Sequence, residues 1–245
     1  MTSRMKTQIG MRSLAILGTA LMTTQMSFAQ EAPTRISWAP SYSGSCTDCT
    51  LAGENLAGWN LTDANYPRVN LTAADLRHVQ GHNTNFTGAI AQGADLRHAD
   101  FTGASFENAI LVGARLQFGQ FNNTKMASTD LSGAHLENGK FIGAILIDAK
   151  LQAGQVFSAD FSAANLTGAT LIAADLTGSM FDNAVLVDTD FSDATLTDVS
   201  FRNARLAGAN LEGTIGIETA DFEGACASAS TRLPISLELM DCAPY

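Results

Sequence analysis

The chain has 245 residues, a formal net charge of -10 and a sequence pI of about 4.7. This length allows one or two ordinary domains. The excess of carboxylates argues against a general affinity for nucleic acid or anionic lipid, which both attract clusters of Lys and Arg.

Residues 1–29 have the three parts of a secretory signal peptide. The basic residues at its start are Arg4, Lys6 and Arg12. A short apolar segment, 14–22, follows and is too short to span a bilayer, while small residues at 27 and 29 allow cleavage after Ala29. We therefore predict export to the periplasm or the exterior of a bacterium; the alternative is an apolar N-terminal tail. Cleavage would leave 11 basic and 24 acidic residues, a net charge of -13.

Residues 30–48 form the next segment, which contains Pro, Ser and Gly together with Trp38 and Tyr42. Its composition is typical of a segment without regular secondary structure. We predict a short leader that ends as an N-terminal cap.

A repeat of five residues, nested in a repeat of twenty, runs from Leu51 to Leu211. Of the 33 sites in this five-residue frame, 28 are Leu or Phe. One site in four is Phe over six successive repeats of twenty, at Phe101, Phe121, Phe141, Phe161, Phe181 and Phe201. Neither a helix nor a flat strand has this spacing. It predicts a solenoid with four short sides per coil and one large inward residue per side.

A second inward position lies two residues before each large one and holds a small residue at 31 of its 33 sites. The exceptions are Glu54 and Trp59. A close-packed core has no room for Trp at a site that elsewhere holds Ala, so we expect Trp59, with Trp38, to plug the N-terminal end. Gly81 and Ala91, at large sites, predict a local dent in the core.

Several five-residue segments read Ala, then Asp or Asn, then Leu, then two variable residues. They include 74–78 (ADLRH), 94–98 (ADLRH), 164–168 (ANLTG) and 209–213 (ANLEG). This pattern resembles the pentapeptide repeat family over about residues 49–225. The resemblance implies an all-β fold, a right-handed quadrilateral β-helix, here with about eight coils.

The frame breaks after Leu211 and resumes one residue late at Phe222, which predicts a small bulge or loop within 214–218. Residues 226–245 leave the repeat pattern. Because Pro234 followed by ISLELMD is typical of a short helix, we predict a C-terminal cap with a helix that covers the last strand edge.

Four cysteines flank the repeat, at Cys46, Cys49, Cys226 and Cys242. Export would permit disulfides. A solenoid on the order of 40 Å long keeps the two pairs apart, so we predict structural disulfides within each pair, 46–49 and 226–242. The Cys-x-x-Cys spacing at 46–49 is also compatible with a redox or zinc half-site.

The most informative surface feature is a duplicated Asp-Leu-Arg-His motif, at 75–78 and 95–98. A twenty-residue coil places Arg77 beside Arg97 and His78 beside His98, about 4.8 Å apart. Stacked imidazoles could share a metal and paired guanidiniums could hold an anion, so these four residues are our candidate surface site. The alternative is that they are ordinary solvent-facing positions, copied with the repeat.

Two further surface features each have a functional and an ordinary interpretation. The first is a group of carboxylates in the C-terminal coils, which is either a calcium site or an ordinary solvated face: Asp182, Asp188, Asp190, Asp193 and Asp198. The second is a set of four outward apolar residues, which are either a docking patch or ordinary, scattered exposed side chains: Ile145, Ile147, Val185 and Val187. The chain has no hydrolase elbow, nucleotide-binding glycine loop or metalloprotease motif, so we expect neither catalysis nor a cofactor.

The sequence therefore predicts an exported, non-enzymatic structural or binding protein whose flat acidic sides contact a protein or cell-envelope partner. It leaves open whether the chain forms a homodimer. One alternative comes from the family, some members of which mimic duplex DNA and protect DNA gyrase. Roughly one net negative charge per 3 Å, against one per about 1.7 Å in DNA, supports it in part, but an exported chain never meets gyrase. The other alternative is a metal- or anion-binding site at the stacked Arg-His motifs.

Overall fold

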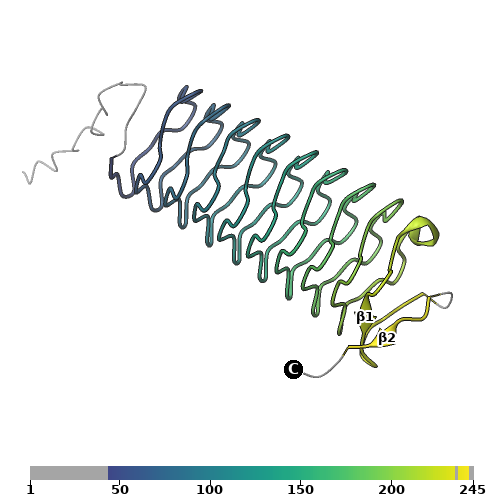
Figure 1. Ribbon diagram of the computed structural model, residues 1–245. Coiled ribbons are helices and arrows are strands. Elements are labelled where there is room, and N and C mark those ends of the chain that lie inside the picture. The colour runs from purple at the N-terminus through teal and green to yellow at the C-terminus, as the bar shows by residue number, and fades with distance from the viewer. Residues whose placement is uncertain (1–43, 235–236, 243–245) are drawn as a thin grey trace, which may run out of the picture. The chain divides into compact units, whose positions relative to one another are not determined.

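The computed structural model describes residues 44–234 and 237–242, most of which are wound into a regular stack of coils (Figure 1). Parallel bridges join every fifth residue to the one twenty positions later, from Ser45↔Asn65 to Thr195↔Ile215 without a slip. The predicted coil of twenty residues with four sides is therefore confirmed. The predicted signal peptide and the leader up to residue 43, including Trp38, lie outside the described residues.

The backbone hydrogen bonds explain why a five-residue unit is stable. In the unit that begins at Leu71, the N–H groups of Leu71 and Ala73 donate to carbonyls of the following coil, at 2.6 and 2.9 Å. Ala74 donates to the Leu71 carbonyl at 2.9 Å and closes a turn, and the last residue of the unit donates to the preceding coil. Only the N–H of Thr72 lacks a backbone acceptor, and the side chain of Asn70 accepts it at 3.0 Å. The Asp or Asn before the large residue therefore completes the hydrogen bonding of the turn.

The third residue of each unit turns the corner with a left-handed backbone. Its φ is positive whether the residue is Gly, as at Gly103 (73°), or Asn, as at Asn138 (56°). Gly, Asn and Asp adopt this conformation at least cost, which explains their frequency at this position.

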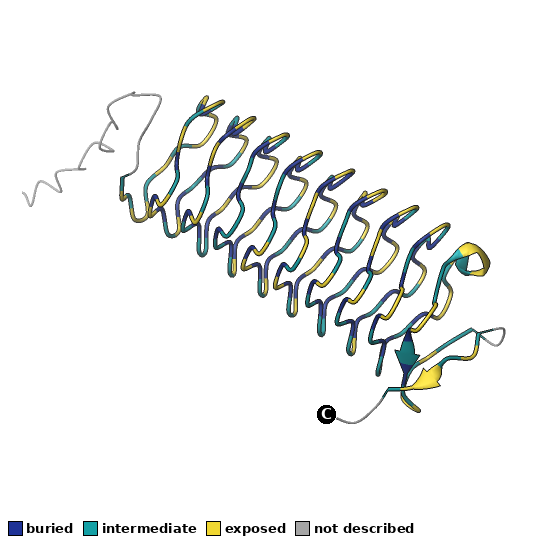
Figure 2. Ribbon diagram, viewed as in Figure 1, coloured by how far each residue is buried: buried dark blue, intermediate teal, exposed yellow. Residues whose placement is uncertain are grey.

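The core is the continuous interior of the coil stack, and Figure 2 shows buried segments, in dark blue, recurring from coil to coil. The predicted phenylalanine ladder is confirmed. Its rings stack at centroid distances of 5.8, 5.1, 4.9, 5.1 and 5.4 Å from Phe101 to Phe201, and Phe222 extends the stack at 4.9 Å. At the small inward position, the buried hydroxyls of Thr84, Thr129, Ser179 and Thr189 donate to carbonyls of the preceding coil, as Thr84 does to Leu61 at 2.7 Å.

The dent predicted at Gly81 is absent, and that prediction was wrong. The aromatic ring of Phe101, in the next coil, occupies the space where a Cβ of residue 81 would lie. Ala91 is also fully buried. A large neighbour thus compensates for a small residue, as close packing requires.

The N-terminal end of the described stack contains Trp59 and the first cysteine pair, while Trp38, the predicted partner of Trp59, lies outside the described residues. Trp59 is half-buried and packs against the core. Cys46 and Cys49 form a disulfide with a Cα–Cα distance of 5.7 Å.

The C-terminal end contains the only helix and strands longer than one residue among the described residues. A 3-10 turn, η1 (Ile217–Thr219), lies in the inserted segment. Beyond it the bridge spacing becomes 21, at Ser200↔Asp221, which confirms the predicted frame break. Strands β1 (Cys226–Ala227) and β2 (Met240–Asp241) then pair in parallel.

The predicted C-terminal helix was wrong, because residues 237–242 contain β2 and no helix. The Cys226–Cys242 disulfide, with a Cα–Cα distance of 4.8 Å, holds this segment beside β1, and the N–H of Cys242 donates to the Ala227 carbonyl. The predicted pairing within each cysteine pair is thereby confirmed at both ends.

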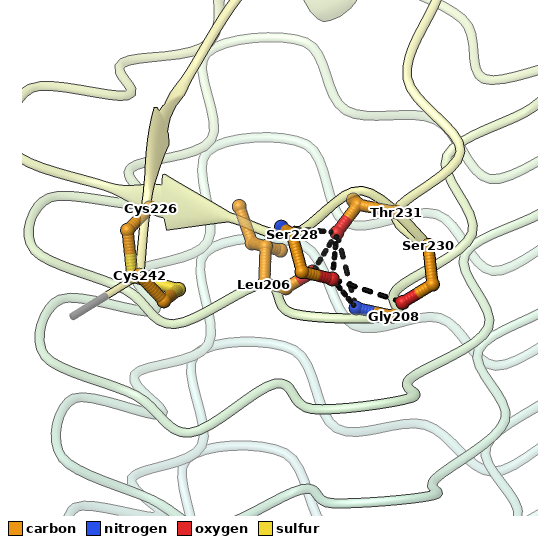
Figure 3. The surroundings of a disulfide bond; sticks show 7 residues. All are labelled: Leu206, Gly208, Cys226, Ser228, Ser230, Thr231 and Cys242. Atoms are coloured by element: carbon orange, nitrogen blue, oxygen red, sulfur yellow. Dashed lines mark hydrogen bonds between the residues drawn. A yellow bond between two sulfur atoms is a disulfide. The ribbon is translucent and has the colours of Figure 1, made fainter. Parts of the chain in front are cut away.

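Side-chain hydroxyls close the last coil next to this disulfide (Figure 3). The N–H of Gly208 donates to both Ser228 Oγ and Thr231 Oγ1, each at 3.0 Å. The Thr231 hydroxyl in turn donates to the Leu206 carbonyl at 2.8 Å. These bonds replace those that a further coil would make, so the end of the stack is capped by hydroxyls and a two-stranded pair.

Candidate functional site

The duplicated motif lies on one side of the coil stack. We call this the His–Phe side and define it by its large inward residues, at positions 76, 96, 116, 136 and 156. Asp75 and Asp95 are bridge partners in adjacent coils. The structure therefore brings the four predicted site residues together with the two histidines stacked as predicted, and it adds Arg–Asp pairs that the sequence analysis did not predict.

The two arginines bind carboxylates of their own turns. Arg77 donates two hydrogen bonds to Asp75, from Nε at 2.8 Å and Nη2 at 2.6 Å. Arg97 binds Asp95 with the same atoms at the same distances. Fork-like pairing thus uses two of the five N–H donors of each guanidinium, and the paired carboxylate offsets the positive charge that would attract an anion.

These ion pairs change the acidity of both carboxyl groups. The hydrogen bond from the Arg77 side chain is the main cause that lowers the pKa of Asp75. At Asp95 burial acts most strongly and favours the neutral form, but the hydrogen bonds and charge of Arg97 outweigh it and lower the pKa overall. Both side chains therefore remain ionised well below neutral pH.

The two histidines form part of a longer aromatic column. The rings of His78 and His98 are 5.1 Å apart and nearly parallel, at 8°, and His98 stacks on Phe118 at 5.1 Å and 5°. Imidazole lone pairs lie in the ring plane, so parallel rings direct them side by side. A shared zinc ion needs the two nitrogens within about 4 Å of each other. The stacking geometry therefore does not suit a metal between the histidines, and no group of three or more possible ligands occurs in the described residues.

The acidic residues of the C-terminal coils are distributed over several sides. Asp190 caps its own turn by accepting the N–H of Ser192 at 2.9 Å, and Asp182 accepts the Ser200 hydroxyl. Asp188 and Asp193 occupy left-handed corner positions on two different sides. These roles belong to the fold, which supports the interpretation as a solvated surface.

The predicted apolar patch is interrupted, as its sequence spacing indicated. Ile145 and Val185 are both bridged to Asn165, which lies between them. Ile145 is 40% exposed. The patch therefore consists of separated side chains rather than one continuous surface.

Sequence reasoning missed a second group on the His–Phe side. Glu137 is 7% exposed, and among the described residues it is the only buried one at the position directly after the large inward residue. His135 Nδ1 lies 3.3 Å from Glu137 Oε1 and 3.1 Å from Gln155 Oε1. Phe118 and Phe157 are 49% and 38% exposed on the same side. Large aromatic residues at outward positions of the five-residue frame were the available signal.

A further property bears on membrane association. Among residues 44–234 and 237–242, no helix has the length and apolar character needed to cross a bilayer.

The repeats of this chain match those of a known protein family. Pentapeptide repeats match in eight copies, over residues 68–103, 82–117, 92–127, 120–152, 159–198 and 196–231. No curated protein sequence matches the chain.

Solved structures of similar fold include HetL, a pentapeptide repeat protein involved in heterocyst differentiation regulation from the cyanobacterium Nostoc sp. strain PCC 7120. It is 25% identical, with a TM-score of 0.47 over 78% of this chain and 91% of HetL. QnrB1, a plasmid-mediated fluoroquinolone resistance protein, is 17% identical, with a TM-score of 0.42 over 75% of this chain and 91% of QnrB1. The repeat match covers most of the coil stack, and the chain belongs to the pentapeptide repeat family, whose fold is the right-handed β-helix.

Proposed function

We propose that this chain is an exported, non-enzymatic binding protein that contacts a protein or cell-envelope partner through its His–Phe side. The observation that carries the proposal is the aromatic column His78–His98–Phe118. Phe118 has a φ of 59° and is 49% exposed. A bulky residue in the left-handed region costs on the order of 1 kcal/mol, and the chain itself buries only part of this ring in return.

Contact with a partner supplies the missing burial. Exposed aromatic rings on rigid backbone are typical of the centres of protein interfaces. Each coil is fixed to its neighbours by backbone bonds, so the column is held in place before a partner arrives. The charged groups beside it, Asp75–Arg77 and Asp95–Arg97, are paired within the chain and form a polar rim.

A site-specific photo-crosslinking experiment tests this proposal. A photoreactive phenylalanine analogue replaces Asn138 on the His–Phe side, or one of three matched residues on the other sides: Asn108, Asn123 or Ala153. All four are exposed and have a positive φ, so the substitutions are equivalent in backbone cost. We expect a discrete adduct in cells only from position 138, lost in Phe118→Ala. Equal adducts from all four sides, or none from 138, would refute the proposal.

Two measurements separate this function from DNA mimicry, which the net charge of -10 favours. Fractionation with N-terminal sequencing should find a chain that begins at Gln30 outside the cytoplasm. A DNA gyrase supercoiling assay should show no effect of the protein. A full-length cytoplasmic chain that inhibits supercoiling would establish the alternative.

A further inference from the structure

Glu137 occupies an unusual environment on the outer side of the coil wall. Its equivalents in the other described coils are half-buried or exposed, and Glu137 alone is buried. Its Oε1 lies 3.3 Å from His135 Nδ1, whereas its Oε2 is buried and has no hydrogen-bond partner among the described residues. A buried carboxylate oxygen without a donor is costly, so something outside these contacts is expected to supply one.

Other side-chain oxygens around Glu137 also lack a hydrogen-bond partner among the described residues or share one. Gln117, at the same position one coil earlier, also has a buried Oε1 without a partner among the described residues. Gln155 Oε1 lies 3.1 Å from His135 Nδ1 and thus competes with Glu137 for a single N–H. Arg115, a cation on the same side, acts on Asp95, in the opposite direction along the stack. A group with donors only would satisfy these oxygens, and ammonium and guanidinium are such groups.

Two exposed aromatic rings flank this acceptor cluster. The N–H of Phe118 donates to the Glu137 carbonyl at 3.1 Å, and the N–H of Asn138 donates to the Phe157 carbonyl at 3.2 Å. The coil of Glu137 therefore runs between the coils of Phe118 and Phe157. One face of the Phe118 ring is stacked on His98, which leaves its other face toward the coil of Glu137. Aromatic faces attract cations, most strongly where water is displaced.

We propose that Glu137, Gln117, Phe118 and Phe157 form a receptor for one Lys or Arg side chain of a protein partner. This inference rests on the proposed binding function and names the chemistry that the His–Phe side recognises. Phe157 lies one coil beyond Glu137, at the same position of the five-residue unit. The cation enters when the exposed Phe157 ring rotates away. It donates hydrogen bonds to Glu137 Oε2 and Gln117 Oε1 and lies against the rings, and the net negative charge of the chain favours its approach.

The test uses nuclear magnetic resonance on the full chain with ¹³C-labelled Glu and Phe. The probes are three capped tripeptides, acetyl-Gly-X-Gly-amide with X as lysine, arginine or citrulline, the last a neutral isostere of arginine. We expect the Glu137 carboxyl and Phe157 ring resonances to shift saturably with the two cationic peptides and not with citrulline. Glu137→Gln should weaken binding at least tenfold. Glu107→Gln, at the equivalent position on another side, should leave it within twofold.

Three outcomes would overturn the inference. The first is shifts that do not saturate, and the second is a Glu137→Gln variant that binds the cationic peptides as tightly as the wild type does. The third is a direct hydrogen bond from the Gln117 amide to the Glu137 carboxyl, with carboxyl resonances that do not shift when the peptides are added. The crosslinking at position 138 decides separately whether the side binds a partner. If the adduct persists unchanged in Glu137→Gln, the proposed function stands and the cation receptor does not.

Discussion

Truncation of Phe141 to Ala tests whether the aromatic ladder carries the stability of the solenoid. Phe141 has no exposed surface, and its ring stacks on Phe121 at 5.1 Å and on Phe161 at 4.9 Å. Removal of a buried Phe side chain costs about 3–5 kcal/mol. We expect the upper part of this range, because two stacked pairs are lost at once and backbone bonds to both neighbouring coils prevent collapse.

The assay is chemical denaturation followed by circular dichroism, with Phe118→Ala as the matched control. The control removes the same atoms from an exposed position and should change the free energy of unfolding by about 1 kcal/mol or less. Phe141→Leu should lose about 1.5 kcal/mol or less, because Leu fills equivalent positions on other sides. Since repeat proteins can unfold in parts, calorimetric and spectroscopic transitions should be compared first. Equal losses from the two alanine variants would refute the reasoning.

Three further predictions address the core, the ion pairs and the cap. Gly81→Ala places a methyl group on the Phe101 ring and should cost about 1–3 kcal/mol by the same assay; an unchanged stability would mean that the ring can move aside. Asp75→Asn keeps the backbone cap but loses the ion pair that lowers the pKa of Asp75. The wild type should therefore be slightly more stable at neutral pH, with the difference vanishing as pH falls through that lowered pKa; a pH-independent difference would contradict this. Replacing Cys226 and Cys242 together with Ser opens a link between residues 16 apart and should cost about 3 kcal/mol, with hydrogen exchange accelerated at the cap alone; faster exchange throughout the core would show that the cap sets global stability.

The sequence determined the register because a single spacing served every coil. A residue such as Phe141 must face inward, because a shift of the frame by one position would turn the large residue of every unit outward. The same spacing identified His78 and His98 as neighbours. It also located the frame break, because one inserted residue shifts every later position.

Local patterns failed where long-range contacts decide the outcome. The segment after Pro234 has helical propensity, but the Cys226–Cys242 disulfide and pairing with β1 make part of it a strand. Similarly, Arg77 and Arg97 are adjacent as predicted, yet each binds a carboxylate of its own turn. Periodicity predicts which residues are neighbours. It does not predict which of several neighbouring groups a long side chain will bind.

The carboxylates of this surface fall into two groups: those whose side chain or position the backbone turn requires, and those that the turn does not require. Asp190 accepts an N–H that the turn would otherwise leave without a partner, so any coil would select it whatever the protein binds. Asp188 occupies a left-handed corner, where Asp is again selected by the backbone. Glu137 does neither: within the described part of the chain its side chain accepts no backbone N–H and its Oε2 has no partner, and its position elsewhere holds many residue types. A costly group that the fold does not require is best explained by something outside the fold, which is why the experiments on this side of the solenoid begin at Glu137.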